Sequence, residues 1–280
     1  MYKNFIRAIM ISVAKSNKKG CHSVAEFFGF GGYTRAAEGF LSWQHLLFVT
    51  ALVGVMIAMA VFLGKRNRAA TAVQKNKVLI VTAIAIDSIE LFKIVLLCFR
   101  ANNPMDWLYN LPLFLCSIQL ITIPLAAFSK GRVREAALDF VCIFGILGAL
   151  LGTYGAGQNY GCYPVLSFDN VVSGVTHTLS GFASLYILIA GMASMKKKNI
   201  PSTFAILLGV CVLAYIANIT IDYNYMFLMR GDGTPYDILY NLVGGHAVLY
   251  PVSVVVLFLI YIVGYYGIYY MATRKKAVSV

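Results

Sequence analysis

The most regular feature of this sequence is a series of long apolar runs separated by short polar segments. Seven runs reach the length of about 20 residues that an α-helix needs to cross the hydrocarbon core of a bilayer. They lie near residues 43–64, 78–99, 107–128, 135–153, 172–195, 202–224 and 246–271. Because backbone amides in lipid must bond within the chain, this pattern predicts an all-α, polytopic membrane helical bundle with seven transmembrane helices.

The segment before the first run has a different pattern. Between residues 3 and 16, apolar side chains recur at helical spacing opposite several cations, over a length too short to span a bilayer. We interpret 3–16 as an amphipathic helix that lies at the membrane interface. The predicted organisation is therefore an N-terminal tail (1–42), a transmembrane domain (43–272) and a basic tail (273–280).

Composition and charge agree with a membrane location. Hydrophobic residues make up 60 % of the 280 residues and charged residues only 12 %, which excludes a soluble globular domain. Cations concentrate in alternate connecting segments, at 64–77, 129–135 and 195–201, and in the C-terminal tail. This asymmetry predicts a cell-membrane protein with a cytoplasmic C-terminus. The net charge of +12 indicates contact with anionic lipid headgroups, and no nucleic acid partner is expected.

The sequence contains no motif for a metal or a soluble cofactor. Its six cysteines are scattered and form no CxxC pair, so a metal site is not predicted. No glycine-rich phosphate-binding motif is present, so no nucleotide cofactor is expected. The oligomeric state is left open.

Ionisable residues inside apolar runs are costly in a bilayer and are therefore informative. Asp87, Glu90 and Lys93 follow one another at three-residue steps and share one slowly turning helix face. This spacing predicts an intramembrane ion pair that stabilises the bundle, with a catalytic or transport role for the same residues as the alternative. Asp139 is expected at the interface, among the cations of the preceding segment.

A second group of chemically active residues falls at one depth. If the seven helices alternate in direction, Cys116 and His177 both lie in the outer half of the bundle. A thiol becomes a nucleophile when a base accepts its proton, so the two form a candidate catalytic pair. A packed cysteine and a hydrogen-bonded core histidine are the alternative. Four supporting residues are expected in the same half: Asp222, His246, Gln119 and Asn110.

The surroundings of Cys116 add two expectations. Gln119, one helical turn after the thiol, is a candidate donor to an oxyanion. Pro112 is expected to bend the third predicted helix near Cys116, because proline removes a backbone donor from a helix.

Three short segments resemble a known family. The runs LPLFLCSIQL (111–120), THTLSGF (176–182) and DYNYMFL (222–228) are similar to the YwaF-like bacterial integral membrane proteins and to their eukaryotic relatives in the transmembrane protein 164 family. The resemblance covers about residues 43–272, so it includes every predicted span and leaves the N-terminal tail out.

This resemblance implies a phospholipid acyltransferase that needs no soluble cofactor. By correspondence, Cys116 would carry the acyl group as a thioester and His177 would act as the base, with membrane phospholipids as partners. One departure is visible, because Phe114 stands where the bacterial members often carry a histidine directly before the Leu-Cys pair. A membrane transporter or small-molecule binding protein that uses intramembrane Asp, Glu and Lys residues is the alternative function.

Overall fold

The computed structural model describes residues 24–278, and every regular element in that range is helical. The all-α prediction is therefore confirmed, whereas the amphipathic helix predicted at 3–16 lies outside the described residues. The long helices are α3 (Trp43–Asn67), α4 (Ala72–Arg100), α6 (Gly131–Thr153), α8 (Phe168–Ile189), α9 (Ile200–Ile221) and α11 (Leu249–Val278). The short ones are η1 (Pro104–Asn110), α5 (Gln119–Phe128), α7 (Gly157–Cys162), η2 (Lys197–Asn199), η3 (Tyr225–Phe227) and α10 (Asp237–Leu242).

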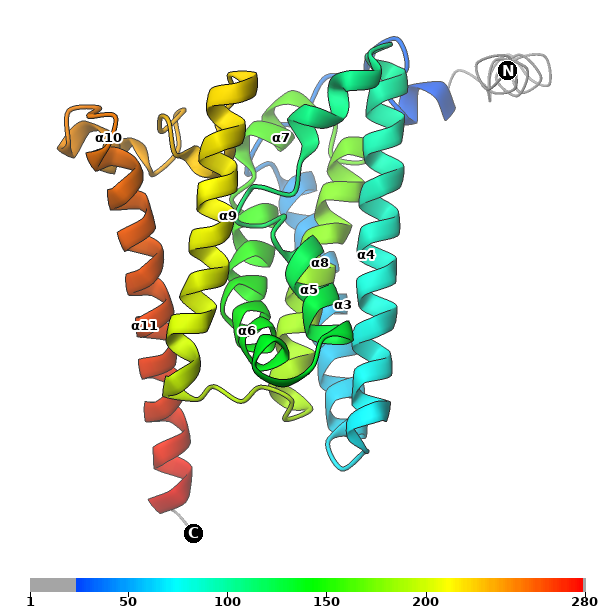
Figure 1. The fold of residues 1–280 in the computed structure, drawn as a ribbon. Coiled ribbons are helices and arrows are strands. Elements are labelled where there is room, and N and C mark those ends of the chain that lie inside the picture. The colour runs from blue at the N-terminus through cyan, green and yellow to red at the C-terminus, as the bar shows by residue number, and fades with distance from the viewer. Residues whose placement is uncertain (1–23, 279–280) are drawn as a thin grey trace.

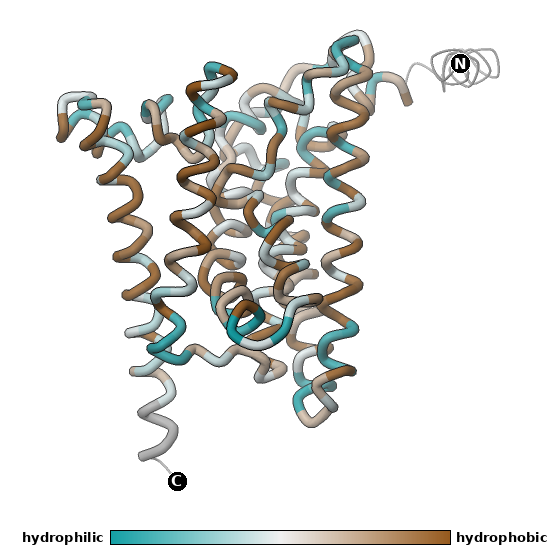
Figure 2. The backbone as a smooth tube through the Cα atoms, in the orientation of Figure 1, coloured by the Kyte–Doolittle hydropathy of each residue, from teal (hydrophilic) through white to brown (hydrophobic). Residues whose placement is uncertain are grey.

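The long helices run side by side along one direction, with α6 and α8 in the middle and α11 at one edge (Figure 1). Apolar residues follow their length and polar residues gather at the two ends (Figure 2). The cation-rich segments 64–77, 129–135 and 195–201 lie at the same end as the C-terminal part of α11 (Figure 1). The predicted charge asymmetry is thus an asymmetry between the two ends of the folded bundle.

Five helical segments of residues 24–278 are long and apolar enough to cross a membrane: Trp43–Asn67, Gly131–Cys162, Phe168–Ile189, Lys197–Ile221 and Leu249–Thr273. The predicted count of seven is not confirmed. The second predicted span corresponds to α4, which has 29 residues but carries Asp87, Glu90 and Lys93 within its apolar stretch.

The third predicted span, 107–128, is not one helix, and that prediction was wrong. The chain forms η1, then an irregular stretch from residue 111 to 118, and then α5 with only ten residues. Leu111 is extended, with φ −64° and ψ 149°, because the ring of the following Pro112 disfavours helical geometry at the preceding residue. Pro112 therefore ends a helix here instead of bending one.

Glycines let the central helices approach closely. A Cβ atom at Gly145 of α6 would lie only 2.7 Å from the carbonyl oxygen of Ser180 in α8. A Cβ atom at Gly181 of α8 would lie 2.6 Å from the Cβ of Ala149 in α6. Small residues at such crossings bring helix backbones together in membranes, where there is no hydrophobic force between helices. The result is a tight α6–α8 core that sets the position of side chains on both helices.

Asp139 corrects another expectation, because it is fully buried instead of interfacial. Its carboxylate accepts hydrogen bonds from the Met195 amide at 2.9 Å, the Asn199 side-chain amide at 2.8 Å and the Tyr266 hydroxyl at 2.9 Å. The Ser194 amide and hydroxyl donate to it as well. These donors offset the cost of burying the charge, so Asp139 ties α6 to the 194–199 segment and to α11.

Residues 24–42 pack over one end of the bundle, where Arg100 of α4 meets Asp169 of α8. The guanidinium forms a two-pronged ion pair with the carboxylate, at 2.7 Å and 3.0 Å. It also donates to the carbonyl of Phe28, and the Tyr33 hydroxyl donates to the same carboxylate. Burial, together with the hydrogen bond to Asp169, raises the pKa of Tyr33 to about 12. The N-terminal segment is therefore held to α4 and α8 by charge-assisted contacts.

Candidate functional site

Cys116 lies in the irregular stretch between η1 and α5, at the level of the central helices. Two local contacts shape this stretch: the Ser117 hydroxyl accepts from the Phe114 amide at 3.0 Å, and the Ile118 amide donates to the Phe114 carbonyl at 3.0 Å. Non-helical backbone at membrane depth occurs where protein or a water-lined cavity surrounds it, because its polar groups need partners. Pro112 thus converts a predicted helix into a set of turns that present the half-buried thiol.

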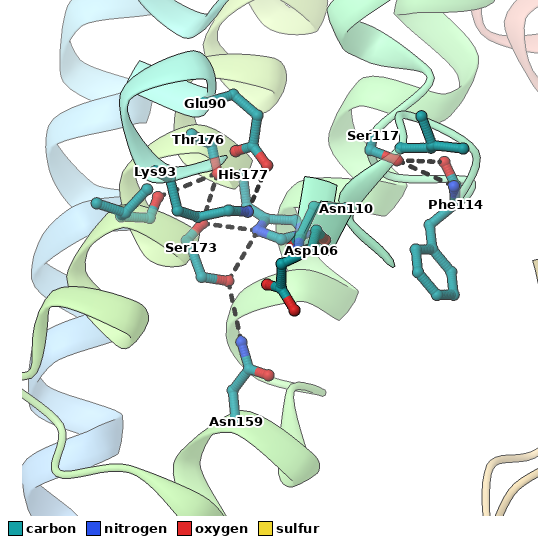
Figure 3. A network of polar contacts seen from close by, with 12 residues as sticks. Glu90, Lys93, Asp106, Asn110, Phe114, Ser117, Asn159, Ser173, Thr176 and His177 are labelled. Carbon is teal, nitrogen blue, oxygen red and sulfur yellow. Dashed lines mark hydrogen bonds and ion pairs between the residues drawn. The ribbon is translucent and has the colours of Figure 1, made fainter. Parts of the chain in front are cut away.

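His177 projects from α8 and is oriented by its own helix (Figure 3). Its Nδ1 atom lies 2.6 Å from the backbone oxygen of Ser173, one turn earlier. A carbonyl oxygen can only accept, so Nδ1 carries the ring proton and Nε2 keeps a lone pair. The Ser173 hydroxyl lies 3.4 Å from Nδ1 and accepts from the Asn159 side chain at 3.3 Å. The ring is therefore held in the tautomer that a general base requires.

The structure brings the Cys116 thiol and the His177 imidazole within interaction range of each other. Because Nδ1 is engaged by Ser173, Nε2 is the ring nitrogen left to accept a proton from the thiol. A thiol that donates to an imidazole is the arrangement from which a cysteine nucleophile is generated. Sequence depth suggested that the two residues share one half of the bundle, and the fold places them in contact.

The ion pair predicted within α4 lies beside this pair. The ammonium of Lys93 and the carboxylate of Glu90 form a salt bridge, with side-chain exposures of only 21 % and 12 % (Figure 3). Lys93 is also close enough to Cys116 and His177 to act on both electrostatically. Asp87, one turn earlier, has a buried carboxylate oxygen with no hydrogen-bond partner among residues 24–278.

Gln119 and Asn110 flank the thiol in sequence and differ in their bonding. Gln119 is fully buried, and its Oε1 atom accepts from the Thr122 hydroxyl at 3.1 Å. Its Nε2 atom has no partner within the described part of the chain, which leaves two buried N–H donors free. Asn110 instead donates to the backbone oxygen of Asp106 at 3.1 Å and so closes η1.

Asp222 and His246, the other two residues expected to support the site, cap helices at the margin of the bundle. Asp222 is exposed and ends α9 in a left-handed conformation, with φ 50°. His246 is exposed, and its Nδ1 atom accepts from the amides of Val248 and Leu249 at the start of α11. The helices α9 and α11 pack together next to α6, whereas α8 packs against α3, α4 and α6. Asp222 and His246 were expected at the same depth as the Cys116–His177 pair, but the fold does not bring them into the site of that pair.

Phe114 faces away from His177 (Figure 3). Its ring packs against Tyr225 at 5.1 Å and Phe227 at 5.8 Å between ring centroids. Tyr225 accepts from the Leu111 amide at 3.0 Å and donates to the Leu108 oxygen. The segment 222–228 therefore holds the segment around Cys116 in place, and a histidine at position 114 would meet tyrosines instead of the imidazole.

Several residues of the site were not foreseen from sequence. Ser173 and Asn159 orient the imidazole. The spacing of Ser173 four residues before His177 was a usable signal, since residues one turn apart on a helix are neighbours. No sequence pattern linked Asn159 to the pair, whereas Tyr225, which anchors the stretch before Cys116, belongs to the DYNYMFL segment of the family resemblance. No cluster of three or more His, Cys, Asp or Glu residues suited to a metal occurs within the described range.

Apolar helices able to cross a bilayer, together with a thiol close to an imidazole between them, define a multi-pass membrane protein with a cysteine–histidine pair. Residues 40–266 match the model of the TMEM164 family, and the chain belongs to that family. This match confirms the resemblance drawn from the three short segments. No curated protein and no solved structure matches the chain.

Proposed function

We propose that this protein is a cysteine-dependent phospholipid acyltransferase, with Cys116 as the nucleophile and His177 as general base and then general acid. The observation that carries the proposal is the closeness of the Cys116 thiol to the His177 imidazole, whose Nδ1 atom is held by the Ser173 carbonyl. Membership of the TMEM164 family supports it, since the family resemblance implies this chemistry. The substrates would be membrane phospholipids, which reach an intramembrane thiol from the bilayer.

The first half of the reaction transfers an acyl group to the enzyme. Nε2 of His177 accepts the thiol proton while the sulfur of Cys116 attacks the carbonyl carbon of a phospholipid ester. The C–S bond forms, the ester C–O bond breaks, and the leaving lysophospholipid oxygen takes the proton from His177. The free Nε2–H donors of Gln119 are suited to stabilise the oxyanion, and the charge of Lys93 stabilises negative charge that develops on sulfur.

The second half returns the enzyme to its starting state. Nε2 of His177 accepts the proton of an acceptor hydroxyl, whose oxygen attacks the thioester carbonyl. The new C–O bond forms, the C–S bond breaks, and the sulfur recovers a proton from His177. No cofactor takes part in either half.

The test is adduct formation on Cys116. The purified full-length protein in bilayers of a phospholipid with labelled acyl chains should acquire label that hydroxylamine removes. Cys116→Ala should abolish the adduct, and Cys162→Ala is the matched control because Cys162 is exposed at the end of α7. An adduct that persists in Cys116→Ala, or no adduct in the wild type, contradicts the proposal.

We also propose a cell-membrane location with the C-terminus in the cytoplasm. In support, the cation-rich segments lie at the C-terminal end of the bundle, whereas Arg100 and Arg230 at the other end are paired with carboxylates. Cys162 should then react with a membrane-impermeant maleimide in intact cells. The signal should vanish in Cys162→Ser, and labelling only after permeabilisation contradicts this topology.

The second candidate function is a transporter that uses intramembrane acids, and one observation favours it: the unpartnered buried oxygen of Asp87. Two of the other acids are less suited to a transport path, since Asp139 is saturated with donors and Asp222 caps a helix at the surface. Substrate flux into proteoliposomes that is lost in Asp87→Asn, with acyl transfer absent, would favour the transporter.

A further inference from the structure

Gly152 of α6 lies directly against the imidazole of His177. A Cβ atom built on Gly152 would fall closer than 3.0 Å to Cδ2, Nε2 and Cγ of the ring, a separation that real Cβ atoms essentially never show. The Cδ2–Nε2 edge of the His177 ring therefore packs directly against the backbone of α6. Any side chain at position 152 would occupy the space that the ring now fills.

One turn earlier on α6, Gly148 faces Cys116, the other member of the pair, but at an ordinary contact distance. A Cβ atom at Gly148 would lie 3.6 Å from the Cα and 3.7 Å from the Cβ of Cys116, which is ordinary van der Waals contact. Residues four apart share one face of a helix, so both glycines face the pair. Only at Gly152 is the missing side chain a steric requirement.

The two edges of the His177 ring are thus controlled by two helices. On the Nδ1 side, the Ser173 carbonyl of α8 accepts the ring proton at 2.6 Å. On the Nε2 side, α6 has no side chain, and Nε2 is the ring nitrogen left for the nearby thiol of Cys116. If the ring were displaced from Gly152, its Nε2 atom would leave the thiol, because the pair and the glycine contact the same edge.

We propose that Gly152 is a positioning residue for the Cys116–His177 pair: it leaves the space in which the imidazole can present Nε2 to the thiol. Gly145 on the same helix has a separate role. Its neighbours are the backbone of Ser180 and the Cβ of Ser184, where α6 crosses α8. Glycine inside a helix is less favourable than alanine, so its presence here has a stability cost. The inference rests on the pair used in the proposed function and does not require that the pair transfers acyl groups.

The test compares Gly152→Ala with Gly148→Ala, two changes of the same kind one turn apart on one helix. Alkylation of Cys116 by iodoacetamide is followed by peptide mass spectrometry in the full-length protein in bilayers, from about pH 5 to about pH 9. Exposed Cys162 is the internal reference. Gly152→Ala should lower the Cys116 rate near neutral pH by at least about tenfold, as should His177→Ala, because the thiol loses its base. Gly148→Ala should retain the wild-type rate and pH profile.

A structural role alone would alter folding without this specific change in the pH profile. If Gly152→Ala does not fold, the double variant Gly152→Ala/His177→Ala provides the second test, because removal of the ring should restore the melting temperature. A Gly152→Ala protein with the wild-type rate and profile overturns the inference. So does equal loss in Gly148→Ala, a His177→Ala rate equal to that of the wild type, or a double variant no more stable than Gly152→Ala.

The outcome is separable from that of the proposed function. Absence of an acyl adduct on Cys116 contradicts acyl transfer, whereas the alkylation comparison still reports whether Gly152 positions the imidazole. Conversely, an adduct that forms equally well in Gly152→Ala supports the acyltransferase and overturns the role of Gly152.

Discussion

The Nδ1 atom of His177 lies 2.6 Å from the backbone oxygen of Ser173, and this contact decides which nitrogen of the ring meets Cys116. Because the partner is a backbone carbonyl on the same helix, the orientation depends on α8 itself and on no ionisable residue. The His177 ring is therefore oriented without the carboxylate that was expected in Asp222.

The free amide of Gln119 leads to a prediction in which activity and stability change in opposite directions. Gln119→Leu removes a buried donor that has no partner, so stability should stay level or rise by up to about 1 kcal/mol. Acyl transfer should fall by about a hundredfold, because the donor to the oxyanion is lost. Melting temperature and transfer rate are measured on the same samples. Thr122→Val is the control, since it removes the Thr122–Gln119 bond and leaves the free amide in place; equal rate losses in the two variants would contradict the role of Nε2.

The orientation of Phe114 predicts the effect of introducing a histidine, the residue that the family resemblance suggests at this position. Phe114→His should not raise acyl transfer per folded molecule, because position 114 faces Tyr225 and Phe227. It should lower the free energy of unfolding by about 1 to 3 kcal/mol, because a polar ring replaces an apolar one in an aromatic cluster. Phe114→Leu provides the comparison for lost aromatic packing alone. A clear gain in rate with histidine would show that this position does reach the pair.

Variants of the Glu90–Lys93 pair distinguish a structural role of this salt bridge from an electrostatic role in acyl transfer. Lys93→Met should lower the free energy of unfolding by about 3 kcal/mol, because it leaves a mostly buried carboxylate unpaired. The double variant Glu90→Gln/Lys93→Met should recover most of that stability, since neither charge remains. Acyl transfer should stay low in both, because the cation near Cys116 and His177 is missing. Full recovery of the rate in the double variant would assign the pair a structural role only.

The raised pKa of Tyr33 predicts a loss of stability in alkaline solution. Burial and the bond to Asp169 raise its pKa to about 12, while an unfolded tyrosine ionises near a pKa of about 10. A raised pKa stabilises the fold below the unfolded value, and that contribution declines as the pH rises from about 10 to about 12. Tyr33→Phe keeps the ring and should lack this component of the decline. Protease cleavage within residues 24–42 across that pH range measures it, and identical profiles for the two proteins would exclude the effect.

The sequence predicted the helical class correctly, because apolar runs in lipid leave few alternatives to helices for satisfying the backbone. It failed at the third run, where hydropathy alone suggested a span and Pro112 instead forced an extended residue at Leu111. It also failed for Asp139, since the donors that make burial tolerable come from the 194–199 segment and α11, distant in sequence. Hydropathy measures the solvent that a segment prefers and not the partners that it finds.

For the site, the sequence determined which reactive groups are present: a thiol in a proline-containing apolar segment and an imidazole in a later helix. It also determined the family to which the chain belongs. Depth along the helices was enough to group Cys116 with His177, but it grouped Asp222 and His246 with them as well. Tertiary structure alone decided which of these residues meet, because α8 packs against α3, α4 and α6, whereas α9 packs against α6 and α11. It also decided that Gly152, a residue without functional groups, controls the ring, since two helix backbones must come close before a missing side chain matters.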